Sequence, residues 1–315
     1  MRAPAVLAVS AISAISVLTV LLCALWILCE PWAWRSARGD GRLHVSFLDV
    51  GQGDAAFLRL PHGTTFLIDA GGLAGATTFD IGDRVVAPVL RHAGVRRLDY
   101  LVLTHGDPDH IGGAAAIVEE FRPRHIWEGV PVPRFEPLKA LHAAAAARAL
   151  DWSIVNAGTH VGVEDVDVAV LHPPPPDWER QRVRNDDSIV LDLRWRGVSV
   201  LMTGDIGKAV ERQLLATITP APLRILKVPH HGSLTSSTPE FIHALHPDIA
   251  VFSAGRNNRF GHPAPEVLER YRTAGVQILR TDQSGEIEIT TDGIAYSSNT
   301  LLHEGTKGNT MDTKR

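Results

Sequence analysis

Residues 103–113 of this 315-residue chain have the sequence LTHGDPDHIGG, and this stretch decides the fold prediction. It continues an apolar run at residues 99–104 that is typical of a buried strand, and a helix is expected to begin near His110. Side chains on such a strand-to-helix loop meet at the carboxyl end of a sheet, where α/β folds form their ligand sites. Two imidazoles and two carboxylates lie within six residues. They are His105, Asp107, Asp109 and His110. Without a cation between them, like groups would repel one another or the side chains would have no chemical role.

A solvated, Asp-rich helix cap is the simpler interpretation of this loop, because Asp and Pro are common at helix starts. The buried strand before the loop favours a metal site instead. Gly112 and Gly113 add to this preference, since they allow close approach of another backbone segment.

Three later apolar strands also end in Asp or His. Residues 200–205 end in Asp205, which could cap the helix expected at 206–215 or bridge two metals about 3.5–4 Å apart. The strand at 223–228 is followed by His230 and His231, which cannot both point the same way from an extended segment. The strand at 249–253 leads to His262. Core packing does not explain four strands that end this way.

Composition limits the chemistry of this site. The formal net charge is −4, which excludes a strongly basic nucleic-acid-binding surface but not a local basic groove. The two cysteines, Cys23 and Cys29, both lie in the first apolar stretch. Any metal in the globular part must therefore bind His, Asp or Glu, a donor set that suits zinc, manganese or iron.

The first apolar stretch, residues 3–28, has no ionisable side chain other than Cys23 and is long enough to cross a bilayer. We expect one transmembrane helix here; a cleaved signal peptide is the alternative. Arg35, Arg38 and Arg42 follow the segment while Arg2 precedes it, which weakly favours a cytoplasmic domain. We therefore divide the chain into an anchor and linker at 1–41, one folded domain at 42–303 and a disordered tail at 304–315.

The pattern within the folded domain predicts two sheets between helical layers. Short strands at residues 45–48, 56–60 and 65–68 come first, and helices alternate with strands afterwards. A second group of strands repeats this scheme and contains hairpins at Arg196-Gly197 and Asp292-Gly293.

The ordered set of His105, Asp107, Asp109, His110, Asp205 and His262 resembles the metallo-β-lactamase superfamily. Three stretches resemble more specifically the hydrolase domain of the ComEC/Rec2 DNA-internalisation proteins. They are LDVGQGD at 48–54, VPHHGS at 228–233 and FGHP at 260–263. The match covers residues 42–291. The resemblance implies an α/β fold, the αββα four-layer sandwich, with a two-metal hydrolytic site and a role in degrading DNA during competence uptake.

The resemblance also implies roles for individual residues. His105 and Asp107 would bind the first divalent metal ion, Asp109, His110 and His262 the second, and Asp205 would bridge the two. Asp69 and Asp54 would support the ligands, and either His230 or His231 would act beside the reacting phosphate or carbonyl. Asp107 stands where the general pattern has histidine, and the third-histidine position falls near residues 185–188, which contain none. These departures favour Mn²⁺, or partial occupancy of the site, over two tightly bound Zn²⁺ ions.

The leading functional hypothesis is a metal-dependent nuclease or phosphodiesterase acting on DNA. Asp109 could hold the attacking water, and Lys227, Arg256 and Arg259 could contact backbone phosphates. A hydrolase of esters, thioesters or lactones would use the same site. A non-catalytic, membrane-tethered module that binds nucleic acid or a separate channel protein is the third hypothesis. The resemblance implies that the domain lies on the outer face of the membrane, and the sequence indicates no oligomeric state.

Overall fold

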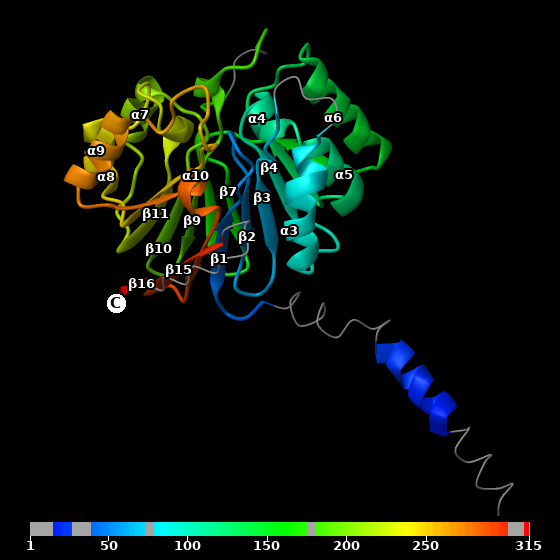
Figure 1. Cartoon of the computed structure of the whole chain (residues 1–315). Helices are drawn as coiled ribbons and strands as arrows, with labels where there is room; N and C mark the ends of the chain where they lie inside the picture. Colours follow the sequence, from blue (N-terminus) through cyan, green and yellow to red (C-terminus); the bar gives the residue numbers. More distant parts are fainter. Residues whose placement is uncertain (1–14, 27–38, 74–78, 176–179, 302–311, 315) are drawn as a thin grey trace, which may run out of the picture.

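The computed structural model describes residues 15–26, 39–73, 79–175, 180–301 and 312–314. Two β-sheets pack face to face, and helices cover the outer face of each (Figure 1). The nine-stranded sheet has the order β16 (Asp312–Lys314), β15 (Tyr296–Leu301), β14 (Glu286–Thr291), β1 (Leu43–Phe47), β2 (Ala56–Arg59), β3 (Thr65–Ile68), β4 (Tyr100–Leu103), β5 (His125–Glu128), β6 (Asp151–Ile154). The seven-stranded sheet has the order β13 (Gln277–Arg280), β12 (Ile249–Phe252), β11 (Leu223–Lys227), β10 (Val198–Met202), β9 (Val190–Trp195), β8 (Val166–His172), β7 (His160–Val163).

Each sheet carries its own helices (Figure 1). The nine-stranded sheet is covered by η1 (Gly82–Val86), α3 (Ala87–His92), α4 (Pro108–Ile111), α5 (Ala114–Phe121) and α6 (Glu136–Ala147). The seven-stranded sheet is covered by α7 (Lys208–Leu214), α8 (Pro239–Leu245) and α9 (Pro265–Thr273). Three further short helices lie between the strands: η2 (Asn185–Asp187), η3 (Pro229–Gly232) and α10 (Thr281–Ser284).

The central strands β3 and β11 are apolar on both faces because both of their faces are buried. In β3, Phe66 and Ile68 pack between the sheets, while Leu67 packs toward the helices. In β11, Ile225 lies between the sheets and Leu226 faces the other helical layer. Successive side chains of a strand point to opposite faces, so a strand covered on both sides needs an unbroken apolar run. The predicted pair of sheets between helical layers is confirmed.

The two sheets bring the ends of their parallel strands together. Strands β3 to β6 are parallel in the first sheet, and β10 to β13 are parallel in the second. The backbone N–H of Ile189, before β9, donates to the carbonyl of Thr104, after β4, over 2.8 Å. This bond joins the two sheets at the carboxyl ends of β4 and β10, where the chemically active side chains lie.

The helix expected to begin near His110 is divided in the structure. It begins at Pro108 as α4 and resumes at Ala114 as α5, with Gly112 and Gly113 between them. The N–H of Gly113 donates to the carbonyl of Gly71 over 2.9 Å, and a Cβ on Gly113 would collide with the backbone of Ala70 and Gly82. The glycines therefore let the loop after β3 pack directly against the loop after β4.

The predicted terminal segments are described only in part. Residues 15–26 form a helix, while residues 3–14 and 27–28 of the predicted span lie outside the described residues, as do Arg35 and Arg38. Within the described ranges, no helix has the length and apolarity that a bilayer crossing requires. Of the predicted tail, residues 304–311 and 315 also lie outside the described part. Residues 312–314 differ from the expected disorder, because they pair with β15 as β16.

Candidate metal centre

Asp69 orients His110 from the loop after β3. Its carboxylate accepts hydrogen bonds from the backbone N–H and the hydroxyl of Thr104, over 2.8 and 2.7 Å. The Nδ1 of His110 lies 2.7 Å from the same carboxylate and donates to it. This bond leaves the lone pair of the neutral imidazole on Nε2. That atom is buried, has no hydrogen-bond partner among the residues that the structure describes, and lies 3.3 Å from Oδ1 of Asp205.

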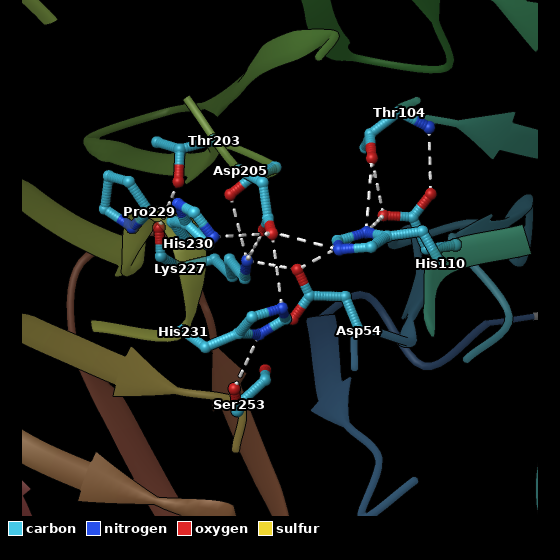
Figure 2. Close-up of polar contacts among 12 residues, drawn as sticks. Asp54, Thr104, His110, Thr203, Asp205, Lys227, Pro229, His230, His231 and Ser253 are labelled. Carbon is cyan, nitrogen blue, oxygen red and sulfur yellow. Dashed lines mark hydrogen bonds and ion pairs between the residues drawn. The ribbon is translucent and has the colours of Figure 1, made fainter. Parts of the chain in front are cut away.

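His231 presents its Nε2 to the same carboxylate from the opposite sheet (Figure 2). Its Nδ1 donates to the carbonyl of Ser253 at the end of β12, over 2.9 Å. Its Nε2 is buried and makes no hydrogen bond within the described structure. This atom lies 3.3 Å from Oδ2 of Asp205 and 3.5 Å from Oδ2 of Asp109. The two oxygens of Asp205 therefore face two different imidazoles, as a bridging ligand requires.

His230 is held differently from its neighbour. Both residues have positive φ angles, 50° for His230 and 53° for His231, so the chain turns sharply between them. The amide of Asn185 donates to Nε2 of His230 over 3.1 Å, and Nδ1 of His230 pairs with the hydroxyl of Thr235 over 3.1 Å. Both nitrogens of His230 are engaged, so His231 is the member of the pair with a free nitrogen. The sequence alone did not single out Asn185, Thr235 or Ser253 for these roles.

His105 and Asp107 form a neighbouring pair. The Nε2 of His105 is buried, makes no hydrogen bond to any described residue and lies 3.3 Å from Oδ2 of Asp107. The rings of His105 and His110 are 4.2 Å apart. His262 lies further out, with its ring 6.5 Å from that of His231. Burial, followed by the charges of His231 and His230, lowers the pKa of His262 to about 4, so its ring is neutral at pH 7.

The donor atoms have the spacing that a bound ion requires. Ligand atoms arranged tetrahedrally around an ion at 2.0–2.1 Å are separated by about 3.3–3.4 Å. The nitrogen-to-oxygen separations at Asp205, Asp109 and Asp107 are 3.3–3.5 Å. Asp54, His110, Asp205 and His231 each offer an atom within 4.8 Å of the others, and all four are buried. Buried donors without hydrogen-bond partners are costly unless a cation satisfies them, so this site fits a divalent metal.

Lys227 lies within this cluster, beside Asp54 and Asp205 (Figure 2), which corrects the prediction that it contacts substrate phosphate. Its side chain is only 2 % exposed and its ammonium forms an ion pair with Asp54. The ammonium also lies 3.7 Å from Oδ1 of Asp205 and donates to the carbonyl of Gly204 over 3.1 Å. A buried ammonium with three protein partners cannot reach a backbone phosphate.

Asp54 approaches the imidazoles from behind. Its oxygens lie 3.7 Å from Nδ1 of His110 and 3.6 Å from Nδ1 of His231, on the side away from the Nε2 atoms. The supporting role that the resemblance implies for Asp54 stays a prediction. Asp54 reaches the site from the loop after β1.

In the metal-free protein, the charges of the buried imidazoles and carboxylates shift one another's pKa values. Burial opposes the charge on His110, but Asp205 and Asp69 outweigh it and raise the pKa of His110 well above 6.5. Burial acts likewise on His231, and Asp205 and Asp54 raise its pKa well above 6.5. The same imidazolium groups overcome burial and hold the pKa of Asp205 well below 3.8. Without metal, the protons on the imidazoles take the place of a cation.

Metal binding is therefore expected to release protons at neutral pH. An ion must displace the protons of His110 and His231, so the apparent affinity for Mn²⁺ should rise between about pH 6 and pH 8. The metal-free protein should show the opposite trend. The stabilisation from these raised pKa values is complete below 6.5 and disappears as the pH rises through the folded-state values. Calorimetric titration with Mn²⁺ in buffers of different ionisation enthalpy measures the release. An observed heat that does not depend on the buffer would contradict it.

The sequence profile of the Metallo-beta-lactamase superfamily matches residues 48–256, which include every donor described above except His262. The chain belongs to the metallo-beta-lactamase superfamily. Its fold is shared with the metallo-beta-lactamase fold protein YhfI from Bacillus subtilis, at a TM-score of 0.50 and 10% identity, covering 76% of this chain and 96% of that one.

This superfamily member is also similar to competence proteins. It is 34% identical to ComE operon protein 3 of Bacillus subtilis, over 78% of this chain and 32% of that protein. It is 34% identical to Competence protein ComA of Neisseria gonorrhoeae, with the same two coverages. Recombination protein 2 of Haemophilus influenzae is 29% identical over 78% of this chain. The chain spans about a third of the length of the first two relatives. These similarities support the resemblance to ComEC/Rec2 proteins.

Proposed function

We propose that this protein is a metal-dependent phosphodiesterase that cleaves DNA. The observation that carries the proposal is the convergence of unpartnered Nε2 atoms from His105, His110 and His231 on the carboxylates of Asp107, Asp109 and Asp205. The similarity to competence proteins supports DNA as the substrate.

The histidines and aspartates of the cluster would bind the metal ions. His105 with Asp107 and His231 with Asp109 would hold two divalent ions, and Asp205, with one oxygen toward His110, would bridge them. Such ions supply a nucleophile at neutral pH and stabilise negative charge on the attacking and leaving oxygens. Asp69 and the Ser253 carbonyl keep the Nε2 atoms of His110 and His231 deprotonated when the ions are bound. His262, neutral and at the outer edge, remains a proposed further ligand.

The proposal predicts cleavage of DNA by the purified protein in the presence of Mn²⁺ or Zn²⁺. His105→Ala and Asp205→Ala should each remove this activity, while wild-type protein in chelator should also be inactive. Hydrolysis of bis-p-nitrophenyl phosphate, measured beside a panel of small esters and lactones, identifies the bond that is broken. If wild-type protein hydrolyses the esters and leaves DNA intact, the phosphodiesterase proposal fails.

We further propose that residues 3–28 anchor the domain as a single-pass membrane protein, on the outer face, beside a separate channel or competence protein. The apolar composition of the segment and the similarity to competence proteins support this arrangement. Protease digestion of intact cells tests the orientation. A domain that is cut only after the cells are lysed would contradict the outer-face location.

A further inference from the structure

We infer that Phe260 and Arg259 form a stacking subsite for a base of an unpaired DNA strand, next to the metal centre. This inference rests on the proposed function, because it names the form of DNA that the site accepts. Phe260 begins the motif FGHP at 260–263, in which His262 is a candidate metal ligand.

The aromatic ring of Phe260 is presented to solvent beside the candidate ligands. It lies on the loop between β12 and α9, and the residue is 54 % exposed. Its ring is 5.9 Å from the ring of His262, at an interplanar angle of 29°. The ring of His262 is in turn 5.7 Å from that of His230. A base stacked on Phe260 would therefore belong to a nucleotide at, or next to, the phosphate held in the site.

The loop that carries Phe260 is held in place by one side chain. The carbonyl oxygen of the Asn258 amide accepts from the backbone N–H groups of Phe260 and His262, over 3.1 Å each. The amide nitrogen of Asn258 donates to the carbonyl of Gly255 over 2.9 Å. A preorganised loop loses little conformational entropy when a ligand binds, so the exposed ring is suited to contact a partner.

The charge beside the ring points to a nucleic acid as that partner. The guanidinium of Arg259 lies 4.9 Å from the centre of the Phe260 ring, and the residue Phe260 remains more than half exposed despite this contact. Arg256 is exposed on the same loop. Aromatic rings that stack on bases, next to cations that follow the backbone, are how proteins bind single strands without reading their sequence.

An unpaired strand fits better than a duplex. The faces of paired bases are covered by their neighbours, so a protruding phenyl ring can stack only on an unpaired or terminal base. Binding to a duplex relies on many phosphate contacts, and the net charge of −4 provides no broad basic surface for them. Stacking therefore carries the selectivity of this site.

The test compares the binding of a fluorescent oligothymidylate with that of a blunt DNA hairpin, by anisotropy, with metal-free full-length protein. Wild-type protein should prefer the oligothymidylate. Phe260→Leu keeps apolar bulk but removes the stacking face, and should weaken oligothymidylate binding roughly tenfold to a hundredfold. Phe260→Trp should retain it.

Matched controls lie at the other end of the sandwich. Arg196, in the β9–β10 turn, stacks on Trp195 with its guanidinium 4.5 Å from that ring, and Ile294 is 80 % exposed in the β14–β15 turn. Arg196→Ala and Ile294→Ala should bind both DNAs as wild-type protein does, whereas Arg259→Ala should weaken oligothymidylate binding.

Three results would overturn the inference: no preference for the single strand, equal binding by Phe260→Leu, or an equal loss on the hairpin. The proposed function is judged separately, from metal-dependent cleavage. If wild-type protein cleaves both DNA forms and Phe260→Leu binds the oligothymidylate and the hairpin as wild-type protein does, the subsite is rejected while the phosphodiesterase stands. If wild-type protein binds single strands through Phe260 but cleaves neither DNA, the subsite stands and the phosphodiesterase proposal is rejected.

Discussion

Asp205→Ala is expected to lower the rate of DNA cleavage by about a thousandfold or more and to reduce the metal content of the purified protein. The Nε2 atoms of His110 and His231 both face the carboxylate of Asp205, each at 3.3 Å. Its removal leaves two imidazoles without the anion between them, so neither proposed ion keeps its full set of ligands. Cleavage rates and elemental analysis of the same preparation measure the two effects.

Asp167→Ala is the matched control for this variant, because Asp167 is an exposed aspartate on β8, away from the cluster. It should keep wild-type metal content and cleavage. An Asp205→Ala protein that retains full metal content would show that Asp205 does not bridge the ions, even if cleavage were lost.

Lys227→Met is expected to destabilise the metal-free protein by about 3–5 kcal/mol, the usual cost of breaking a buried ion pair. The ammonium of Lys227 and the carboxylate of Asp54 are buried together, and each favours the charged form of the other. Without Lys227, the anion of Asp54 keeps only the imidazoles of His110 and His231 as nearby positive groups. Urea unfolding in the presence of chelator measures the change in the free energy of unfolding.

The double variant Asp54→Asn, Lys227→Met separates charge from packing. Asp54→Asn alone removes the nearest carboxylate of the Lys227 ammonium and leaves that positive charge beside Asp205. It should therefore both destabilise the protein and weaken Mn²⁺ binding by electrostatic repulsion. Adding Lys227→Met removes that ammonium and should recover much of both losses. Losses that simply add in the double variant would mean that the two residues are not coupled.

The fold was largely predictable because it follows from local patterns. The apolar strands, the glycine-rich turns and the loop at residues 103–113 are each visible in a short stretch of sequence. Each of these local patterns is consistent with the same pair of sheets. The division of the predicted helix into α4 and α5 was missed. Its cause, the packing of Gly113 against the backbone of Ala70 and Gly82, is a contact between distant residues.

The site could be predicted less completely, because long-range contacts decide the roles of its residues. His230 and His231 are equivalent in the sequence, and only the carbonyl of Ser253 and the amide of Asn185 distinguish their nitrogens. Lys227 ends β11 and was predicted to contact substrate phosphate, but Asp54, on the loop after β1 of the other sheet, holds it inside. A signal for this pair existed, since a lysine that ends a strand buried on both faces needs an acidic partner.

The central claim is that these Asp and His side chains bind divalent ions, and anomalous X-ray scattering from crystals grown with Mn²⁺ tests it most directly. The account predicts manganese peaks within bonding distance of Nε2 of His110 or His231 and of Asp205, at about 2.0–2.3 Å. Manganese found elsewhere, with His110, His231 and Asp205 contacting only one another at saturating Mn²⁺, would contradict it.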